Sequence, residues 1–253
     1  MFSNISRTFL PYSLISGCLL VFLLFSLSSS TLSAQVSKRD SLLKLVNQSK
    51  ALLHKNSKDT LYIHDLTMLA AEYRFHNLDS LLSLSKEGLT ISKKADYKNG
   101  IIRSYINMGG YYSDTGKIDE AISYFNKAYE LACQEKNLNL KVSTLNDLAK
   151  EYMYKGDYAL SLKKYLEAIE IAEELDYKKL LSIVNENIAH LYLGQKDFDH
   201  AMVFFKKAKE INEEIGNPIF MAETMSNLAS TYAEMNELEY AMFNINSSIA
   251  IFE

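Results

Sequence analysis

Residues 107–132 read NMGGYYSDTGKIDEAISYFNKAYELA, and the same pattern returns twice at intervals of 40 residues. It reads DLAKEYMYKGDYALSLKKYLEAIEIA at 147–172 and NIAHLYLGQKDFDHAMVFFKKAKEIN at 187–212. In each copy two apolar stripes at helical spacing flank a short polar turn, which is the pattern of a helical hairpin. Because one hairpin cannot bury both stripes, the hairpins must stack on one another. The sequence therefore predicts an all-α fold, a right-handed α-solenoid of stacked helical hairpins.

A fixed set of small and aromatic positions recurs in this frame. Each unit has a tyrosine, a small residue nine positions later, a large apolar residue four positions after that, and another small residue three positions further on. These positions are Tyr112, Tyr152, Tyr192, Tyr232; Ala121, Ser161, Ala201, Ala241; Phe125, Tyr165, Phe205, Ile245; and Ala128, Ala168, Ala208, Ser248. We expect the small residues to let two helices approach closely and the aromatic residues to fill the gaps between hairpins. Tyr152 is expected to be largely buried against the following hairpin.

This spacing resembles the tetratricopeptide repeat. That family places a large apolar residue, a Leu-Gly pair, a tyrosine, an alanine, an aromatic residue and a second alanine in one order. The matching residues here are Tyr105, Met108, Gly109, Tyr112, Ala121, Phe125 and Ala128. The usual unit has about 34 residues and the unit here has 40, so each helix is expected to be longer. The family's closing proline is missing. The resemblance covers about residues 61–253 and implies a binding module with no catalysis of its own.

The repeat frame predicts a domain organisation. Five units are expected at residues 61–99, 100–139, 140–179, 180–219 and 220–253. Residues 35–60 have helical periodicity and are predicted to cap the start of the solenoid. The fifth unit is incomplete, and its second helix would leave an apolar face in water where a solenoid end normally carries a polar one. We therefore expect the chain to be a truncated piece of a longer protein or an incomplete gene product.

The first 34 residues differ from the rest of the chain. Arg7 is their one charged side chain, an apolar run follows that is densest in LLVFLLF at 19–25, and small residues lead to Ala34. This is the order of a secretory signal peptide, with cleavage expected after Ala34. Two alternatives are a lipoprotein cleavage box that ends at Cys18 and an uncleaved membrane anchor at residues 10–27. The prediction is an exported protein, in the periplasm or the envelope of a Gram-negative bacterium.

Composition and motifs argue against several functions. The net charge is −4 and there is no block of basic residues, so nothing indicates nucleic-acid binding. The five histidines lack the spacing of a zinc-binding helix, and no phosphate-binding glycine loop, serine nucleophile elbow or paired-cysteine site is present. After cleavage Cys133 is the one remaining cysteine, which is expected to be a small apolar helix residue. We expect no enzymatic activity, no metal and no cofactor.

A polar column follows the first helix of the units. Asn107, Asp147, Asn187 and Asn227 each precede the Leu-Gly-like pair, and Arg103, Lys150 and His190 lie one helical turn from a member of the column. The amides could clamp the backbone of an extended peptide in the concave groove, or they could cap or brace neighbouring helices. In tetratricopeptide proteins this position commonly lines the peptide groove. The pattern that grips a carboxylate is present only in fragments.

Two functions compete. The first is an exported tetratricopeptide module that binds a protein or peptide in its groove. The alternative is the periplasmic sensory region of a membrane histidine kinase or transcriptional regulator, because DSLL at 40–43 and LAAEYRF at 69–75 look like the input regions of such Bacteroidetes proteins. A scaffold for envelope assembly is a third possibility. Contact with a membrane would come from an uncleaved N-terminal segment or from a region that is missing at the C-terminus.

Overall fold

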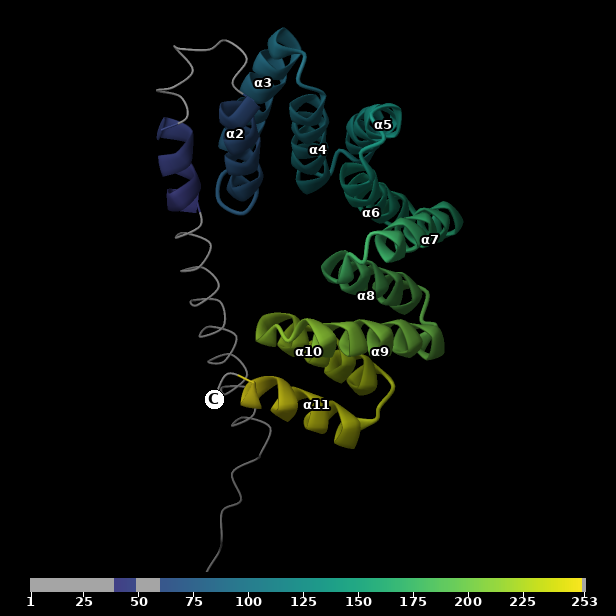
Figure 1. Cartoon of the computed structure of the whole chain (residues 1–253). Helices are drawn as coiled ribbons and strands as arrows, with labels where there is room; N and C mark the ends of the chain where they lie inside the picture. Colours follow the sequence, from purple (N-terminus) through teal and green to yellow (C-terminus); the bar gives the residue numbers. More distant parts are fainter. Residues whose placement is uncertain (1–38, 49–59, 252–253) are drawn as a thin grey trace, which may run out of the picture.

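The computed structural model describes residues 39–48 and 60–251, and every regular element in these ranges is a helix (Figure 1). Residues 39–48 form a first helix. The helices that follow are α2 (Thr60–Tyr73), α3 (Leu78–Ala95), α4 (Lys98–Asp114), α5 (Ile118–Gln134), α6 (Leu138–Lys155), α7 (Tyr158–Glu174), α8 (Lys178–Gly194), α9 (Phe198–Ile215), α10 (Pro218–Glu234) and α11 (Leu238–Ala250). The prediction of an all-α fold is confirmed. The predicted signal peptide, with Cys18, lies outside the described residues, as do residues 35–38 and 49–59 of the predicted cap.

The helices pair into antiparallel hairpins, and the hairpins stack into an arc. The pairs are α2–α3, α4–α5, α6–α7, α8–α9 and α10–α11, and each pair packs on the next. Figure 1 shows α4, α6 and α8 on the inner side of the arc and α5 and α7 on its outer side. The first helices of neighbouring hairpins also contact one another directly, as in α2–α4, α4–α6 and α6–α8. The side chains of these first helices therefore decide the chemistry of the concave surface.

Helix ends follow from residues that the turns carry. Asn137, Asp157 and Asp197 stand at N-caps, where the side chain accepts a hydrogen bond from a backbone N–H that has no partner inside the helix. Each such cap stabilises its helix by about 1 kcal/mol. At the other end of α6, Gly156 has φ +84°, a left-handed conformation that glycine adopts at little cost. The polar turns of the sequence thus contain the residues at which one helix ends and the next begins.

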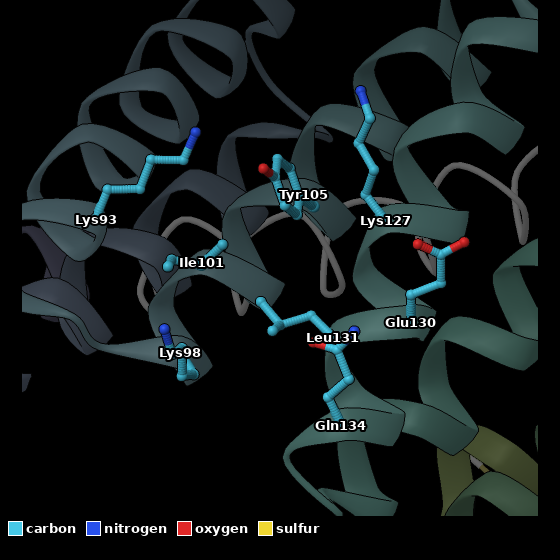
Figure 2. Close-up of a pocket in the computed structure, with 8 residues that line it drawn as sticks. All are labelled: Lys93, Lys98, Ile101, Tyr105, Lys127, Glu130, Leu131 and Gln134. Atoms are coloured by element: carbon cyan, nitrogen blue, oxygen red, sulfur yellow. The ribbon is translucent and has the colours of Figure 1, made fainter.

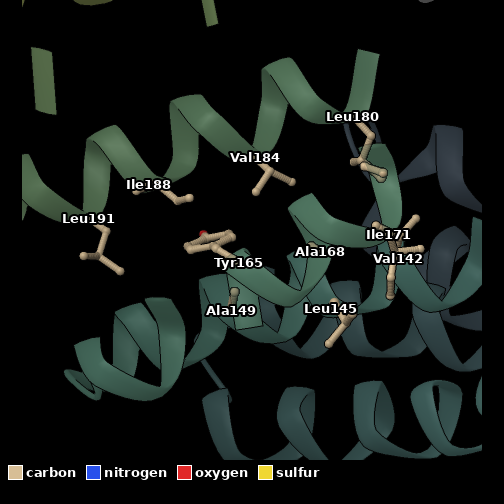
Figure 3. Close-up of a cluster of buried hydrophobic side chains, with 11 residues drawn as sticks. Val142, Leu145, Ala149, Tyr165, Ala168, Ile171, Leu180, Val184, Ile188 and Leu191 are labelled. Atoms are coloured by element: carbon tan, nitrogen blue, oxygen red, sulfur yellow. The ribbon is translucent and has the colours of Figure 1, made fainter. Parts of the chain in front are cut away.

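The core is formed by the small and aromatic positions of the repeat. Ala121, Ser161 and Ala201 are fully buried, and so are Ala128, Ala168 and Ala208. Phe125, Tyr165 and Phe205 are equally buried. A methyl group on Gly109 would lie 2.6 Å from the ring of Phe125, so α4 and α5 touch at a point where no side chain fits. Figure 3 shows Tyr165 between Ala149 of α6 and the apolar face of α8, so the aromatic position joins two hairpins as expected.

Tyr152 does not occupy that joining position. It is half-buried and packs against Ala121 and Phe125 of the preceding hairpin, together with Leu148. The prediction that it is largely buried against the following hairpin is therefore wrong. The residue that fills the space between α6 and α8 is Tyr165, which reaches them from α7.

The two ends of the described solenoid differ. At the first end, Val46 of the initial helix packs against Tyr62, Leu66 and Leu69 of α2. At the other end, large apolar side chains of α11 are exposed: Leu238, Tyr240, Met242 and Phe243. Met242 is 63% exposed, whereas Met202, 40 residues earlier, is 7% exposed because α10 packs on α9. None of the described helices is long and apolar enough to cross a lipid bilayer.

Candidate functional site: the inner face of the solenoid

Two members of the predicted polar column connect neighbouring hairpins. Asn107 is buried, and its Nδ2 donates to the backbone oxygen of Thr67 over 2.8 Å. Asn187 is half-buried, and its Nδ2 donates to Oδ1 of Asn146 over 2.8 Å. Each bond runs to the first helix of the preceding hairpin. These two amides therefore brace the stack, and any role of theirs in binding a partner stays a prediction.

The other two members have different surroundings. Asp147 is half-buried and lies near the charges of Arg74 and Lys150; burial raises the pKa of its carboxyl group, and the two basic groups oppose that rise. Asn227 is half-buried, and its backbone oxygen accepts a bond from the Thr231 hydroxyl. Half-burial leaves both side chains in reach of a molecule in the groove.

The three flanking residues are spread along the inner face. Arg103 on α4 places Nη1 3.5 Å from the sulfur of Met68. Lys150 is half-buried on α6, near Asp147 and Glu151. His190 on α8 is exposed at one edge, while its ring packs edge-on against Phe205 with ring centres 5.2 Å apart. Desolvation lowers the pKa of His190 below its ordinary value of 6.5, so this imidazole is mainly neutral at pH 7.

An ion pair that the sequence analysis missed lies near this face. Arg74 follows α2, and its Nε and Nη2 each lie 2.6 Å from an oxygen of Asp114 at the end of α4. Two parallel bonds of this kind are the strongest geometry for a guanidinium and a carboxylate. The guanidinium packs on Gly110, where a methyl group would lie 3.1 Å from Nη1. The pair joins the first two hairpins and leaves Arg74 occupied.

Glu151 is a buried carboxylate beside that pair. It is 1% exposed, one carboxylate oxygen interacts with Ser113, and its Oε2 has no hydrogen-bond partner in the described part of the chain. Burial raises the pKa of Glu151. The fully buried hydroxyl of Tyr165 is equally without a partner there, and it feels the charges of Asp147 and Glu151.

The repeat itself contained the signal for these two residues. Glu151 stands 40 residues before the buried Leu191, and Tyr165 stands 40 residues from both Phe125 and Phe205. The position of Glu151 thus holds a fully buried leucine in the next unit and the half-buried Tyr111 in the preceding one, and the position of Tyr165 holds phenylalanine in both. A polar side chain at such a position is unusual unless its polar atom finds a partner.

More carboxylates lie between α8 and α10. The Thr224 hydroxyl donates to Glu186, and Glu223 is close enough for its charge to raise the pKa of Glu186, although burial is the larger cause. The 40-residue frame places Glu223 at the position of Arg103. This part of the inner face is therefore acidic, and such carboxylates bind donors and cations. Groups of three or more metal-ligating side chains do not occur in residues 39–48 and 60–251.

A pocket of about 310 Å³ lies elsewhere, where α3, α4 and α5 meet (Figure 2). Figure 2 shows Lys93 and Lys127 on either side of Tyr105. Lys127 already lies over the ring of Tyr124, at 4.7 Å, and Lys98 pairs with Asp96 at 2.6 Å. Because Lys98 and Lys127 already have local partners, this pocket is a weaker candidate than the inner face.

Comparisons with known proteins agree with the prediction of tetratricopeptide-like repeats. Tetratricopeptide repeat models match residues 141–214 and 102–132, so these segments are tetratricopeptide repeats. No curated protein sequence matches the chain. Solved structures share its fold at low sequence identity.

Three of these structures illustrate the range. BtubC from P. vanneervenii superposes with a TM-score of 0.68 at 18% identity, over 86% of this chain and 91% of that one. A signal transduction ATPase with a tetratricopeptide repeat sensor from Pyrococcus horikoshii gives 0.64 at 20% identity, over 86% of this chain and 35% of that one. A Rap protein complexed with competence and sporulation factor superposes with a TM-score of 0.58 at 19% identity, over 81% of this chain and 57% of that one. The likeness shows a tetratricopeptide-like solenoid fold.

Proposed function

We propose that this protein is a non-catalytic module that binds an extended protein or peptide segment along its inner face. The observation that carries the proposal is the polar, half-buried character of that face. Asp147, Lys150 and Asn227 stand there on helices whose other faces are packed with apolar residues. Polar side chains at the edge of a packed surface orient a ligand, while the apolar surroundings strengthen each hydrogen bond. The Rap protein, a solved relative in fold, is complexed with a factor, which supports a binding role.

A selection experiment tests this proposal. Random twelve-residue peptides are displayed against the full chain, and the affinities of the enriched peptides are measured by fluorescence anisotropy. Asn227→Ala removes one hydrogen-bonding side chain and should weaken binding about two- to tenfold, the equivalent of about 0.5–1.5 kcal/mol. Lys163→Ala, an exposed position on the outer helix α7, is the matched control and should change nothing. Failure to enrich any peptide, or equal losses in both variants, would contradict binding at the inner face.

A sensory role is the second candidate. Its support is the solved ATPase whose tetratricopeptide repeats form a sensor, together with the resemblance of residues 40–43 and 69–75 to exported input regions. We propose that binding at the inner face then reports to an output domain. The genomic sequence after the codon for Glu253 tests this directly: a membrane helix followed by kinase or regulator motifs supports it, and a stop codon contradicts it.

Export belongs to the same proposal and has its own test. Residues 1–34 have the order of a signal peptide. Expression in a Gram-negative host followed by fractionation and N-terminal sequencing should give a periplasmic chain that begins at Gln35. A chain that keeps Met1 in the cytoplasmic fraction would overturn export and leave the binding proposal intact.

A further inference from the structure

The third hairpin, α6–α7, carries polar groups that its neighbours lack. Asp147 stands where Asn107 and Asn187 stand in the adjacent units, and Glu151 stands where the fourth hairpin has Leu191. Tyr165 replaces a phenylalanine. Since the same frame folds in the fourth hairpin without these groups, packing does not require them.

The charges at this place do not cancel. Arg74 is the strongest base nearby, but its guanidinium is held by two bonds to Asp114. Lys150 is then the one remaining base named among the charges acting on Asp147 and on Glu151. Two carboxylates therefore share one ammonium group: Asp147 is half-buried and also accepts a hydrogen bond from the Asn146 side chain, and Glu151 is fully buried.

The geometry places a binding site rather than a structural brace here. Asp147 is half-buried and can be reached from the inner face. Glu151 lies one helical turn further along the same face of α6, where it is 1% exposed and its Oε2 has no partner in the described structure. A buried acceptor without a donor is unfavourable, and such groups concentrate where a ligand supplies the missing donor.

We propose that Asp147 and Glu151 form a subsite for the guanidinium or ammonium group of an arginine or lysine side chain in the bound peptide. The cation forms an ion pair with Asp147, and Glu151, which is buried one helical turn further along α6, adds its negative charge to the same place. Tyr165 contributes its hydroxyl dipole from the opposite helix of the hairpin. The subsite rests on the proposed function, because the rest of the peptide lies along the groove. The carboxylates Glu186 and Glu223 on α8 and α10 extend the same preference for a basic segment.

Five peptide pools test the subsite. Each is an acetylated and amidated nonapeptide pool with a random background and one fixed central residue: arginine, lysine, citrulline, norleucine or glutamate. Anisotropy with the full chain should show that the arginine and lysine pools bind at least tenfold more tightly than the citrulline and norleucine pools. Glu151→Gln keeps the shape and removes the charge, and it should reduce that ratio to below threefold. Asp147→Asn should do the same, which covers the case in which one variant folds poorly.

Two controls make the result specific. Glu174→Gln makes the same charge change at an exposed position on α7 and should leave the ratio unchanged. Tyr165→Phe restores the residue of the aligned positions; it should fold normally and lower the affinity of the arginine pool two- to fivefold.

The outcomes separate the two proposals. If wild-type protein binds no pool, peptide binding and the subsite both fail. If it binds all pools equally, or if Glu151→Gln and Asp147→Asn leave the preference for arginine intact, the subsite fails and the proposed function stands.

Discussion

The third and fourth hairpins, α6–α7 and α8–α9, follow one frame with different chemistry. Both bury an alanine from the first helix, at Ala149 and Ala189, and a large ring from the second, at Tyr165 and Phe205. In the fourth hairpin the aligned neighbour of that core is Leu191, which is fully buried. In the third it is Glu151, whose buried Oε2 has no hydrogen-bond partner in the described structure. The repeat therefore accepts a glutamate at a position where packing requires only a side chain of similar size to leucine.

The difference separates what the solenoid needs from what a ligand would need. Packing needs small residues at the helix contacts and large ones between hairpins, and both hairpins supply them. The extra charge and hydroxyl of the third hairpin add desolvation cost without completing their hydrogen bonds. Proteins keep such unfavourable groups mainly at functional sites. Exchanging the residues at positions 151 and 191 between the two hairpins therefore tests most directly whether Glu151 serves packing or binding.

The largest effect should come from breaking what the two hairpins share. Tyr165→Ala and Phe205→Ala each remove a fully buried ring between two hairpins, so each should lower the free energy of unfolding by about 3–5 kcal/mol. Urea titrations followed by circular dichroism measure this. If one variant loses less than about 1 kcal/mol, the two hairpins do not share a core frame.

A smaller change of opposite sign is expected at Glu151. Glu151→Leu installs the residue of the fourth hairpin and removes an unpartnered buried carboxylate, so it should raise the free energy of unfolding by about 1–3 kcal/mol at pH 7. Arg74 keeps Asp114 as its partner, so no base is left alone. The reciprocal control, Leu191→Glu, should destabilise the fourth hairpin. A loss of stability in Glu151→Leu would mean that the carboxylate is structural.

The polar column should divide into braces and free groups. Asn107→Ala removes a buried bond to α2 and should cost about 0.5–1.5 kcal/mol of unfolding free energy. Asn227→Ala, at the aligned position, should change stability by no more than about 0.5 kcal/mol. Thermal melts of the two variants measured side by side decide this, and equal losses would show that Asn227 also braces the fold.

The smallest effect is a dependence on pH. Burial raises the pKa of Glu151 above its ordinary 4.5, so the folded protein binds this proton more readily than the unfolded chain does. Stability then falls as pH rises through the interval between 4.5 and the raised value. Wild type should therefore gain stability relative to Glu151→Gln as the pH falls from 7 toward 4.5. His190 titrates in both proteins, so it cancels in the difference; a difference that is flat or of opposite sign would contradict the raised pKa.

Most of the fold could be predicted from the sequence, because it depends on the regular spacing of apolar, small and aromatic residues. The spacing of Tyr112, Ala121, Phe125 and Ala128 fixes which faces of two helices are apolar, and repetition of that spacing requires stacking. The error at Tyr152 has a simple origin. A conserved spacing shows that a residue faces a neighbour, but it does not show which of the two neighbouring hairpins that is.

The site was less predictable, because the spacing of residues in the sequence does not show which neighbouring atoms a polar side chain contacts. Sequence placed Asn107, Asp147, Asn187 and Asn227 on one line, and only the packed structure showed that Asn107 and Asn187 bond to a preceding hairpin whereas Asp147 and Asn227 have other surroundings. Arg74 and Asp114 are 40 residues apart and belong to different hairpins, so their ion pair depends on how the stack brings turn and helix end together. A deviation from the repeat, such as Glu151 for leucine, was visible in the sequence, but its meaning was not.

The sequence by itself determined the helices, their pairing and the small and aromatic contacts, since these follow from local period and from side-chain size. Only the tertiary structure decided which polar atoms are satisfied. A hydrogen bond depends on atoms placed within about 3 Å by helices that are far apart in the chain. That is why Asn107 and Asn227 share one letter and one register, yet differ in what they contact, and why Oε2 of Glu151 became a candidate site only once its surroundings in the described structure were known.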